Sequence, residues 1–158
     1  MRVGIIHSDR TIIELLKLVV ENEGFEAQGL DLVNFIGVRD LVPPINKFLT
    51  EKNPSVVLFD IGSAVKYHDN IELYKKVKET NIKRIFVPII LGCEEKEKVV
   101  RAGEREGIKF NYVCNAGNTT EIGGLIRIIE EDTKKIAKEK ETKMPVECFC
   151  KRSKECEP

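Results

Sequence analysis

The stretch VVLFDIG, residues 56–62, decides which fold the sequence predicts. Its first four residues, Val56–Phe59, form an apolar run without alternation. Such a run is typical of a strand that is buried on both faces of a parallel sheet. The run ends on a single carboxylate, Asp60. We therefore expect a buried strand that carries Asp60 at its carboxyl end, and the role of this side chain becomes the question for the rest of the chain.

Strand-length apolar runs alternate with helix-periodic segments on both sides of this stretch. We expect strands at residues 3–6, 25–30, 55–60, 84–91 and 110–114. We expect helices at residues 10–23, 45–53, 71–80, 95–106 and about 119–140. Ser8 or Asp9 is expected to cap the first helix, and Gly24 marks its end. This alternation predicts an α/β fold of three layers, in which a five-stranded parallel sheet is covered by helices on both faces.

The composition of the chain indicates which classes of binding partner to expect. The chain has 26 basic and 26 acidic residues, so its overall field does not attract nucleic acid, and we expect no nucleic-acid partner. No apolar run approaches the ~20 residues that span a bilayer, and the first ten residues do not read as a signal peptide. We expect no membrane partner and a cytoplasmic location. The many Lys, Glu and Ile residues and the absence of Trp are a composition typical of hyperthermophiles, including archaea.

The carboxyl ends of the predicted strands should meet at one edge of the sheet, where α/β proteins bind ligands. Gly92 and Cys114 end predicted strands and belong to this edge. The crevice that we expect there is formed by His7, Ser8, Asp9, Asp60, Cys93 and Asn115.

Three segments resemble the receiver domain of bacterial and archaeal response regulators. RVGIIHSDRTIIELLKLVVENEGFEAQG is similar to the first strand, first helix and second strand of a receiver. NPSVVLFDI is similar to the strand with the phosphorylated aspartate, and FNYVCNAG lies where the family has its last strand and a lysine-proline pair. The resemblance covers residues 1–140, with extra residues around DLVNFIGVRDLVPP, and it implies a flavodoxin-like sheet with strand order 2-1-3-4-5. It leaves residues 141–158 as a cysteine-containing tail.

The sequence departs from the receiver pattern at the positions that carry its chemistry. The resemblance implies an acidic pair after the first strand that holds magnesium with the phosphoacceptor, but His7 and Ser8 stand there. The family's hydroxyl falls on Gly92 or Cys93, and its lysine falls on Asn115. Of the positions that carry the chemistry of a receiver, only Asp60 matches the family's residue.

One carboxylate without these partners has little with which to stabilise phosphoryl transfer. We therefore do not expect magnesium, and we interpret Asp60 as a vestigial phosphoacceptor. Two alternatives stay open for Asp60: an ordinary strand-end carboxylate that accepts backbone N–H bonds, and an aspartate that is still phosphorylated.

The expected strand order limits which residues at this edge could bind one metal ion together. His7 and Cys114 would lie three strands apart, roughly 14 Å at ~4.8 Å per step, which is too far for one zinc ion. Cys93 with Cys114 remains open as a pair, although a cysteine that ends a buried strand is commonly a small apolar filler.

The tail offers a second metal candidate. Pro145 is expected to interrupt any helix, and Cys148, Cys150 and Cys156 follow with the spacing C-x-C-x5-C. Three close thiolates suit zinc or an iron-sulfur cluster, although this spacing lacks the two separate pairs of ordinary zinc sites. The alternative is a flexible tail whose cysteines share no function.

Two functions follow from these patterns. The first is a non-catalytic regulatory or protein-interaction module that binds a protein partner or forms a homodimer through a helical face, with residues 96–106 and 120–131 as candidates. The second is a small metal- or thiol-binding protein that uses the tail, as an accessory subunit or as part of an enzyme. We do not expect a conventional enzyme, because neither of the two histidines lies in a motif such as G-x-S-x-G or H-E-x-x-H.

Overall fold

The computed structural model describes residues 1–61, 67–90, 96–110 and 113–155, and only the backbone of residues 67–69, 96 and 140–155. The chain forms two compact units, Met1–Gly123 and Gly124–Pro158. The first unit contains the whole sheet, and the second contains most of one long helix. Each unit is described by itself.

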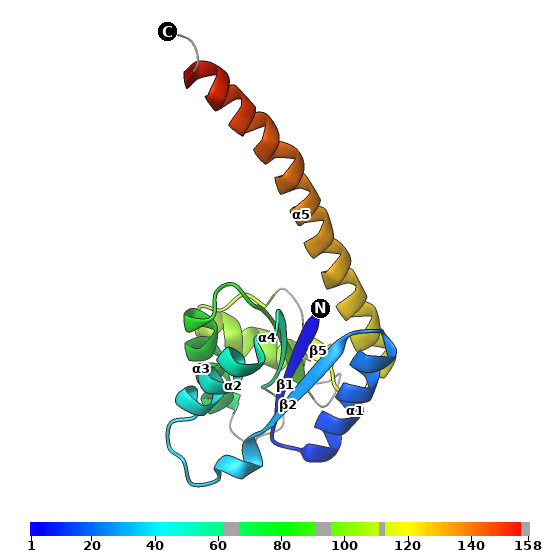
Figure 1. The fold of residues 1–158 in the computed structure, drawn as a ribbon. Coiled ribbons are helices and arrows are strands. Elements are labelled where there is room, and N and C mark those ends of the chain that lie inside the picture. The colour runs from blue at the N-terminus through cyan, green and yellow to red at the C-terminus, as the bar shows by residue number, and fades with distance from the viewer. Residues whose placement is uncertain (62–66, 91–95, 111–112, 156–158) are drawn as a thin grey trace. The chain divides into compact units, whose positions relative to one another are not determined.

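The described strands form one parallel sheet (Figure 1). Its order is β2-β1-β3-β4-β5, which confirms the predicted order 2-1-3-4-5. The strands are β1 (Arg2–His7), β2 (Glu26–Asp31), β3 (Val56–Asp60), β4 (Ile85–Ile90) and β5 (Cys114–Asn115). All four neighbouring pairs are parallel, so the carboxyl ends of the strands share one edge.

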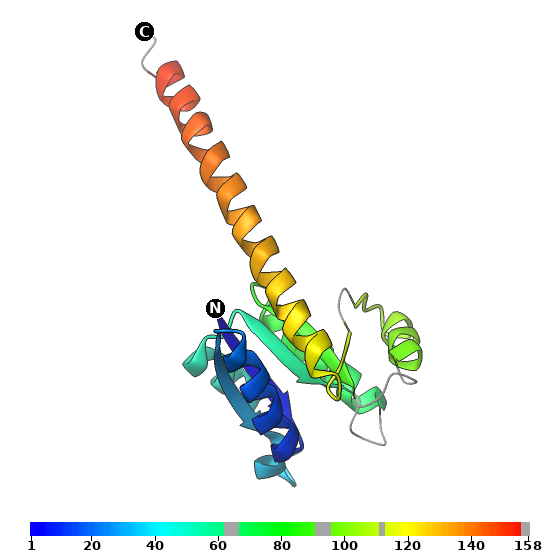
Figure 2. The same ribbon diagram turned by 90° about the vertical axis from the view of Figure 1, so that its right-hand side faces the viewer.

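Helices cover both faces of the sheet (Figure 2). In chain order the helices are α1 (Arg10–Asn22), α2 (Val42–Lys52), α3 (Tyr67–Thr80), α4 (Lys96–Arg105) and α5 (Thr119–Glu155), most of which forms the second unit, with a short 3-10 helix η1 (Leu32–Phe35) after β2. On one face, α2, α3 and α4 pack against alternate strand residues such as Ile6, Val57 and Phe59. On the other face α1 lies directly on β2, where a Cβ on Gly29 would come 2.5 Å from the Ile13 side chain.

The core between the sheet and α2–α4 is organised around Tyr74, which is 1% exposed. Its ring makes edge-on contacts with Phe59, Phe86 and Phe110 at centroid distances of 5.5, 5.9 and 5.4 Å. Burial raises the pKa of the Tyr74 hydroxyl. These aromatic contacts tie β3, β4 and the segment after α4 to α3, and Phe59 directly precedes Asp60 at the end of β3.

The structure corrects three predicted boundaries. The strand predicted at 110–114 is limited to Cys114–Asn115 in the described chain, and residues 111–112 lie outside it. The helix predicted at 71–80 starts at Tyr67, because the apolar period that begins at Ile71 marks only its buried turns. The last helix continues through Pro145 to Glu155, since a proline within a helix can kink it without ending it. The predicted division at residue 140 thus falls within α5 and stays a prediction.

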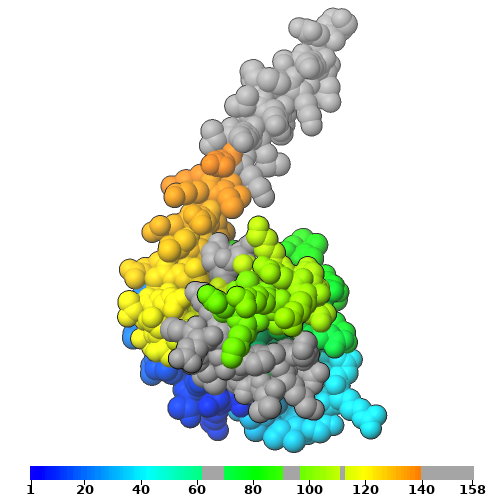
Figure 3. All heavy atoms as spheres, turned by 180° about the vertical axis from the view of Figure 1, so that it is seen from behind, coloured from blue at the N-terminus to red at the C-terminus, as the bar shows by residue number. Residues whose placement is uncertain are grey.

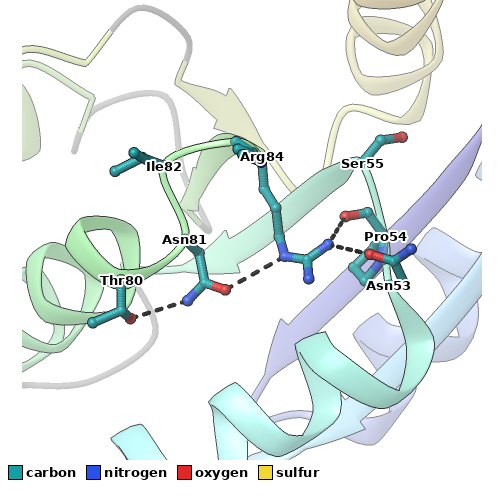
Figure 4. A pocket seen from close by; sticks show the side chains of 8 residues that line it. Asn53, Pro54, Ser55, Thr80, Asn81, Ile82 and Arg84 are labelled. Carbon is teal, nitrogen blue, oxygen red and sulfur yellow. Dashed lines mark hydrogen bonds between the residues drawn. The ribbon is translucent and has the colours of Figure 1, made fainter.

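The amino edge of the sheet is held by Arg84 (Figure 4). The Arg84 guanidinium donates to the Asn53 Oδ1 and Pro54 carbonyl at 3.0 and 2.6 Å, to the Leu49 carbonyl at 2.9 Å and to the Asn81 Oδ1 at 3.4 Å. These acceptors belong to the turns that end α2 and α3. A hollow of about 460 Å³ lies beside them, lined by residues 53–55 and 80–84. The partial negative charge of two helix ends disfavours an anion there, so Arg84 joins the two turns and is not an anion-binding group.

We expect Arg84→Ala to lower the free energy of unfolding by about 2 to 3 kcal/mol, because four acceptors lose a charged donor. Urea unfolding measures this change. The neighbouring exposed Lys83 provides the control, and Lys83→Ala should change stability by less than about 0.5 kcal/mol. Equal effects of the two substitutions would contradict a joining role for Arg84.

Candidate functional site

The carboxyl edge of the sheet brings His7 and Asp60 together. Pairing of β1 with β3 aligns Ile6 with Phe59, so the next residues along the two strands, His7 and Asp60, are neighbours. Both are buried, with 1% and 5% of their surface exposed. The His7 Nε2 lies 3.6 Å from the Asp60 Oδ2. The sequence therefore correctly predicted that these residues share an edge, and the structure adds that their side chains face each other.

The other ring nitrogen of His7 determines the form of the imidazole. The Asp9 backbone N–H donates to His7 Nδ1 at 2.9 Å, so Nδ1 acts as an acceptor and carries no proton. In a neutral imidazole the proton then lies on Nε2, which faces Asp60. The structure thus holds His7 as one tautomer of the neutral ring.

Two neighbouring polar residues complete the cluster. The Ser8 hydroxyl donates to the Asp60 Oδ2 at 3.3 Å, the same oxygen that faces His7. Asp9, and not Ser8, caps α1: its Oδ1 accepts the N–H groups of Thr11 and Ile12 at 2.8 and 3.4 Å. We call His7, Ser8, Asp9 and Asp60 the carboxyl-edge cluster.

Asp31 adds a third carboxylate that the sequence analysis missed. It is the last residue of β2 and pairs with His7 in the sheet register. Its Oδ1 accepts the Val33 N–H at 3.0 Å and so starts η1. The predicted strand ended one residue before Asp31, although a strand-end aspartate is the same signal that identified Asp60.

The charge state of His7 reflects two opposing effects. Burial lowers the pKa of the imidazole, and the nearby carboxylates of Asp60, Asp9 and Asp31 oppose this by favouring the charged form. The net result is a pKa below the ordinary value of 6.5. His7 is therefore neutral at pH 7, in agreement with the hydrogen bond that its Nδ1 accepts.

Ser8, His7 and Asp60 do not form a nucleophilic triad. In such a triad the histidine accepts the serine proton, and the aspartate orients the histidine. Here the Ser8 hydroxyl donates to Asp60, and the Nδ1 of His7 is already occupied by a backbone N–H. His7 is also too deeply buried to reach a substrate. The arrangement satisfies buried polar groups and does not activate a nucleophile.

The magnesium that the fold implies does not fit the described residues of this edge. Magnesium prefers several oxygen ligands in octahedral geometry. Asp60 supplies one carboxylate, and the carboxylate of Asp9 is turned toward the first N–H groups of α1. The imidazole of His7 fills the position beside Asp60 and presents an N–H donor there. No catalytic step through magnesium follows from this donor set.

The predicted residues from the other strands lie apart from the carboxyl-edge cluster. Asn115 ends β5, three strands from β1, and its Oδ1 accepts the Gly117 N–H at 2.9 Å. Cys114 is buried. Gly92 and Cys93 lie outside the described residues, so the pair of Cys93 with Cys114 stays a prediction.

No predicted metal site is supported by the part of the chain that the structure describes. Among its side chains, no group of three or more His, Cys, Asp and Glu residues could hold a metal ion. The side chains of Cys148 and Cys150 and the whole of Cys156 lie outside this description. Zinc or an iron-sulfur cluster at the tail therefore stays a prediction.

The apolar side of one predicted docking face is buried. The apolar residues Val99 and Val100 of α4 pack into the core, although the helix itself lies at the surface (yellow-green in Figure 3). The amphipathic period of this segment thus indicated core packing and not a docking surface. On α5, Ile122 is buried, whereas Ile128 is 52% exposed.

Comparisons with known proteins identify the fold. No family model matches the sequence, and no curated protein matches it. Among solved structures, the receiver domain of the Francisella response regulator 1452 is 17% identical with a TM-score of 0.57, over 84% of this chain and 98% of that domain. NtrX from Brucella abortus is also 17% identical, with a TM-score of 0.63 over 87% of this chain and 28% of NtrX. This chain thus spans about a quarter of the length of NtrX.

A third similar structure belongs to a family of streptococcal redox sensors that evolved from two-component response regulators. It is 11% identical with a TM-score of 0.59, over 87% of this chain and 54% of the sensor. At these identities the likeness concerns the fold. The chain therefore contains a receiver-like domain with the flavodoxin-like topology that the sequence predicted. None of the helices in the described ranges is long and apolar enough to span a membrane.

We expect the free energy of unfolding to decrease as the pH falls below about 6.5. The unfolded chain then binds a proton that buried His7 resists, so stability is full above pH 6.5 and is lost toward the lowered pKa of the folded state. One histidine limits the slope to about 1.4 kcal/mol per pH unit. Urea unfolding at several pH values measures it.

His7→Asn should flatten this pH dependence, whereas His68→Gln, which removes the other histidine, should retain it. An unchanged slope in His7→Asn would show that His7 is not the group responsible.

Proposed function

We propose that the chain is a non-catalytic regulatory domain, resembling a receiver that has lost magnesium-dependent phosphorylation, and that it acts by binding a protein partner or a second copy of itself. One observation carries the proposal. The buried imidazole of His7 faces Asp60 at 3.6 Å, where the resemblance implies a metal-binding carboxylate. The phosphoacceptor position is thereby built into a hydrogen-bonded cluster.

The electrostatics of the cluster support this proposal. Phosphoryl transfer to a carboxylate builds up negative charge, which receivers offset with a metal ion and a lysine. The described residues around Asp60 provide a neutral imidazole and a hydroxyl instead. The lysine position holds Asn115, whose side chain accepts a backbone N–H in the next turn. Asp60 is also 5% exposed, which limits access to a phosphodonor.

Loss of phosphorylation is compatible with a signalling role. The similar streptococcal proteins are redox sensors that evolved from response regulators, so the fold has taken a different input elsewhere. An output through protein contacts needs exposed apolar residues. The segment around η1 provides Val33, Ile36 and Val38, of which Ile36 is 82% exposed. These residues lie within the extra segment that sets the sequence apart from the receiver pattern.

We expect the wild-type chain to gain no phosphoryl group when it is incubated with magnesium and acetyl phosphate, and native mass spectrometry measures the mass of the product. Magnesium should also leave the unfolding temperature unchanged relative to a monovalent salt of equal ionic strength. A phosphoryl group located on Asp60 would contradict the proposal.

The double variant His7→Asp/Ser8→Asp tests whether the replacement of the acidic pair is what prevents magnesium binding. It restores the acidic pair, so without metal it should be destabilised by carboxylate repulsion, and magnesium should raise its unfolding temperature. Ser8→Asp alone is the matched control, because it retains the imidazole beside Asp60 and should respond less. Equal responses of wild type and double variant would show that His7 does not determine metal binding.

A further inference from the structure

We propose that the carboxyl-edge cluster makes the start of α1 respond to pH: a proton taken up by His7 replaces its hydrogen bond with the Asp9 backbone N–H and displaces the Ser8–Asp9 turn. The inference rests on the proposed function, because it requires that neither magnesium nor a phosphoryl group acts at Asp60. The inference assigns to this edge of the sheet a signal of its own, a change in pH.

The step follows from the hydrogen-bond geometry. In the observed state the Nδ1 lone pair of His7 accepts the Asp9 N–H at 2.9 Å. A proton from solvent binds to the same lone pair, and both ring nitrogens then become donors. Two donors cannot share this contact, so the Asp9 N–H must separate from the ring. The two states of the turn are therefore mutually exclusive.

Carboxylates surround the ring and stabilise the charged state once the turn has moved. Asp60 on β3 faces Nε2 at 3.6 Å, Asp9 lies in the turn itself, and Asp31 lies on β2 beside His7. Within the described part of the chain, these three carboxylates are the charged groups that act on His7. Burial opposes the charge, so the proton is taken up below the ordinary range of histidine and not at neutral pH.

Two secondary-structure elements are linked directly to this change. The Asp9 carboxylate holds the Thr11 and Ile12 N–H groups, so a displaced Asp9 alters the first turn of α1. The Asp31 carboxylate holds the Val33 N–H at the start of η1, and a charged His7 competes for that carboxylate. Val33 is 45% exposed, so the second link reaches the surface of the domain.

Nuclear magnetic resonance on the isotope-labelled full chain tests the proposal between about pH 7.5 and 5. We expect the imidazole resonances of His7 and the amide resonances of Asp9, Thr11 and Ile12 to change with one common midpoint below pH 6.5. The Val33 amide should follow the same curve. The imidazole nitrogen shifts report which ring nitrogen carries the proton at each end of the titration.

Three variants separate the proposed link from general effects of acid. In His7→Asn the side-chain Oδ1 can accept the Asp9 N–H as Nδ1 does, but it does not titrate, so the four amide curves should be flat. In Asp60→Asn the midpoint should move down by about one pH unit, because a carboxylate that favours the charged ring is lost. His68→Gln should leave all curves unchanged.

Three results would overturn the inference. His7 could titrate while the Asp9, Thr11 and Ile12 amides stay still, or those amides could titrate equally in His7→Asn. Unfolding before His7 titrates would also contradict it, because the folded domain would then have no second state. The proposed function fails separately, through phosphorylation of Asp60 at neutral pH, where His7 is uncharged.

Discussion

The buried contact between His7 and Asp60 is the constraint on which the carboxyl edge depends. A carboxylate that is 5% exposed requires polar partners, since an unpaired buried charge costs several kcal/mol. The Ser8 hydroxyl and the Nε2 side of His7 meet the same oxygen of Asp60, while the Asp9 N–H occupies Nδ1. These contacts supply polar partners for the Asp60 carboxylate and for both ring nitrogens of His7. The described residues of this edge therefore supply polar partners for the strand-end aspartate.

Different polar side chains hold the turns at the two edges of the sheet. At the amino edge a permanently charged arginine, Arg84, donates to acceptors in two turns, and no pH change in the physiological range alters it. At the carboxyl edge a neutral histidine accepts one hydrogen bond from the turn before α1 and faces the carboxylate at the end of β3. The first arrangement is fixed. The second depends on a single proton, which is why we place the responsive part of the domain there.

Much of the fold was readable from the sequence, because apolar strands and amphipathic helices alternate with clear boundaries. The alternation together with the receiver likeness predicted the strand order, and the strand ends predicted that His7 and Asp60 share an edge. The contact between Asp9 N–H and His7 Nδ1 was not predictable, because it depends on the turn geometry after β1. The last strand was predicted to begin too early because an apolar run does not reveal where pairing begins. Pro145 was misread because a proline within a helix can kink it without ending it.

The most direct test of the central claim is a high-resolution crystal structure grown with magnesium and beryllofluoride, a mimic of a carboxylate-bound phosphoryl group. The account predicts that Asp60 carries neither, and that the His7 ring still accepts the Asp9 N–H and faces the Asp60 carboxylate. Density for magnesium and beryllofluoride at Asp60, with the imidazole displaced, would contradict it. The domain would then be a working receiver in which a histidine replaces one of the acidic residues.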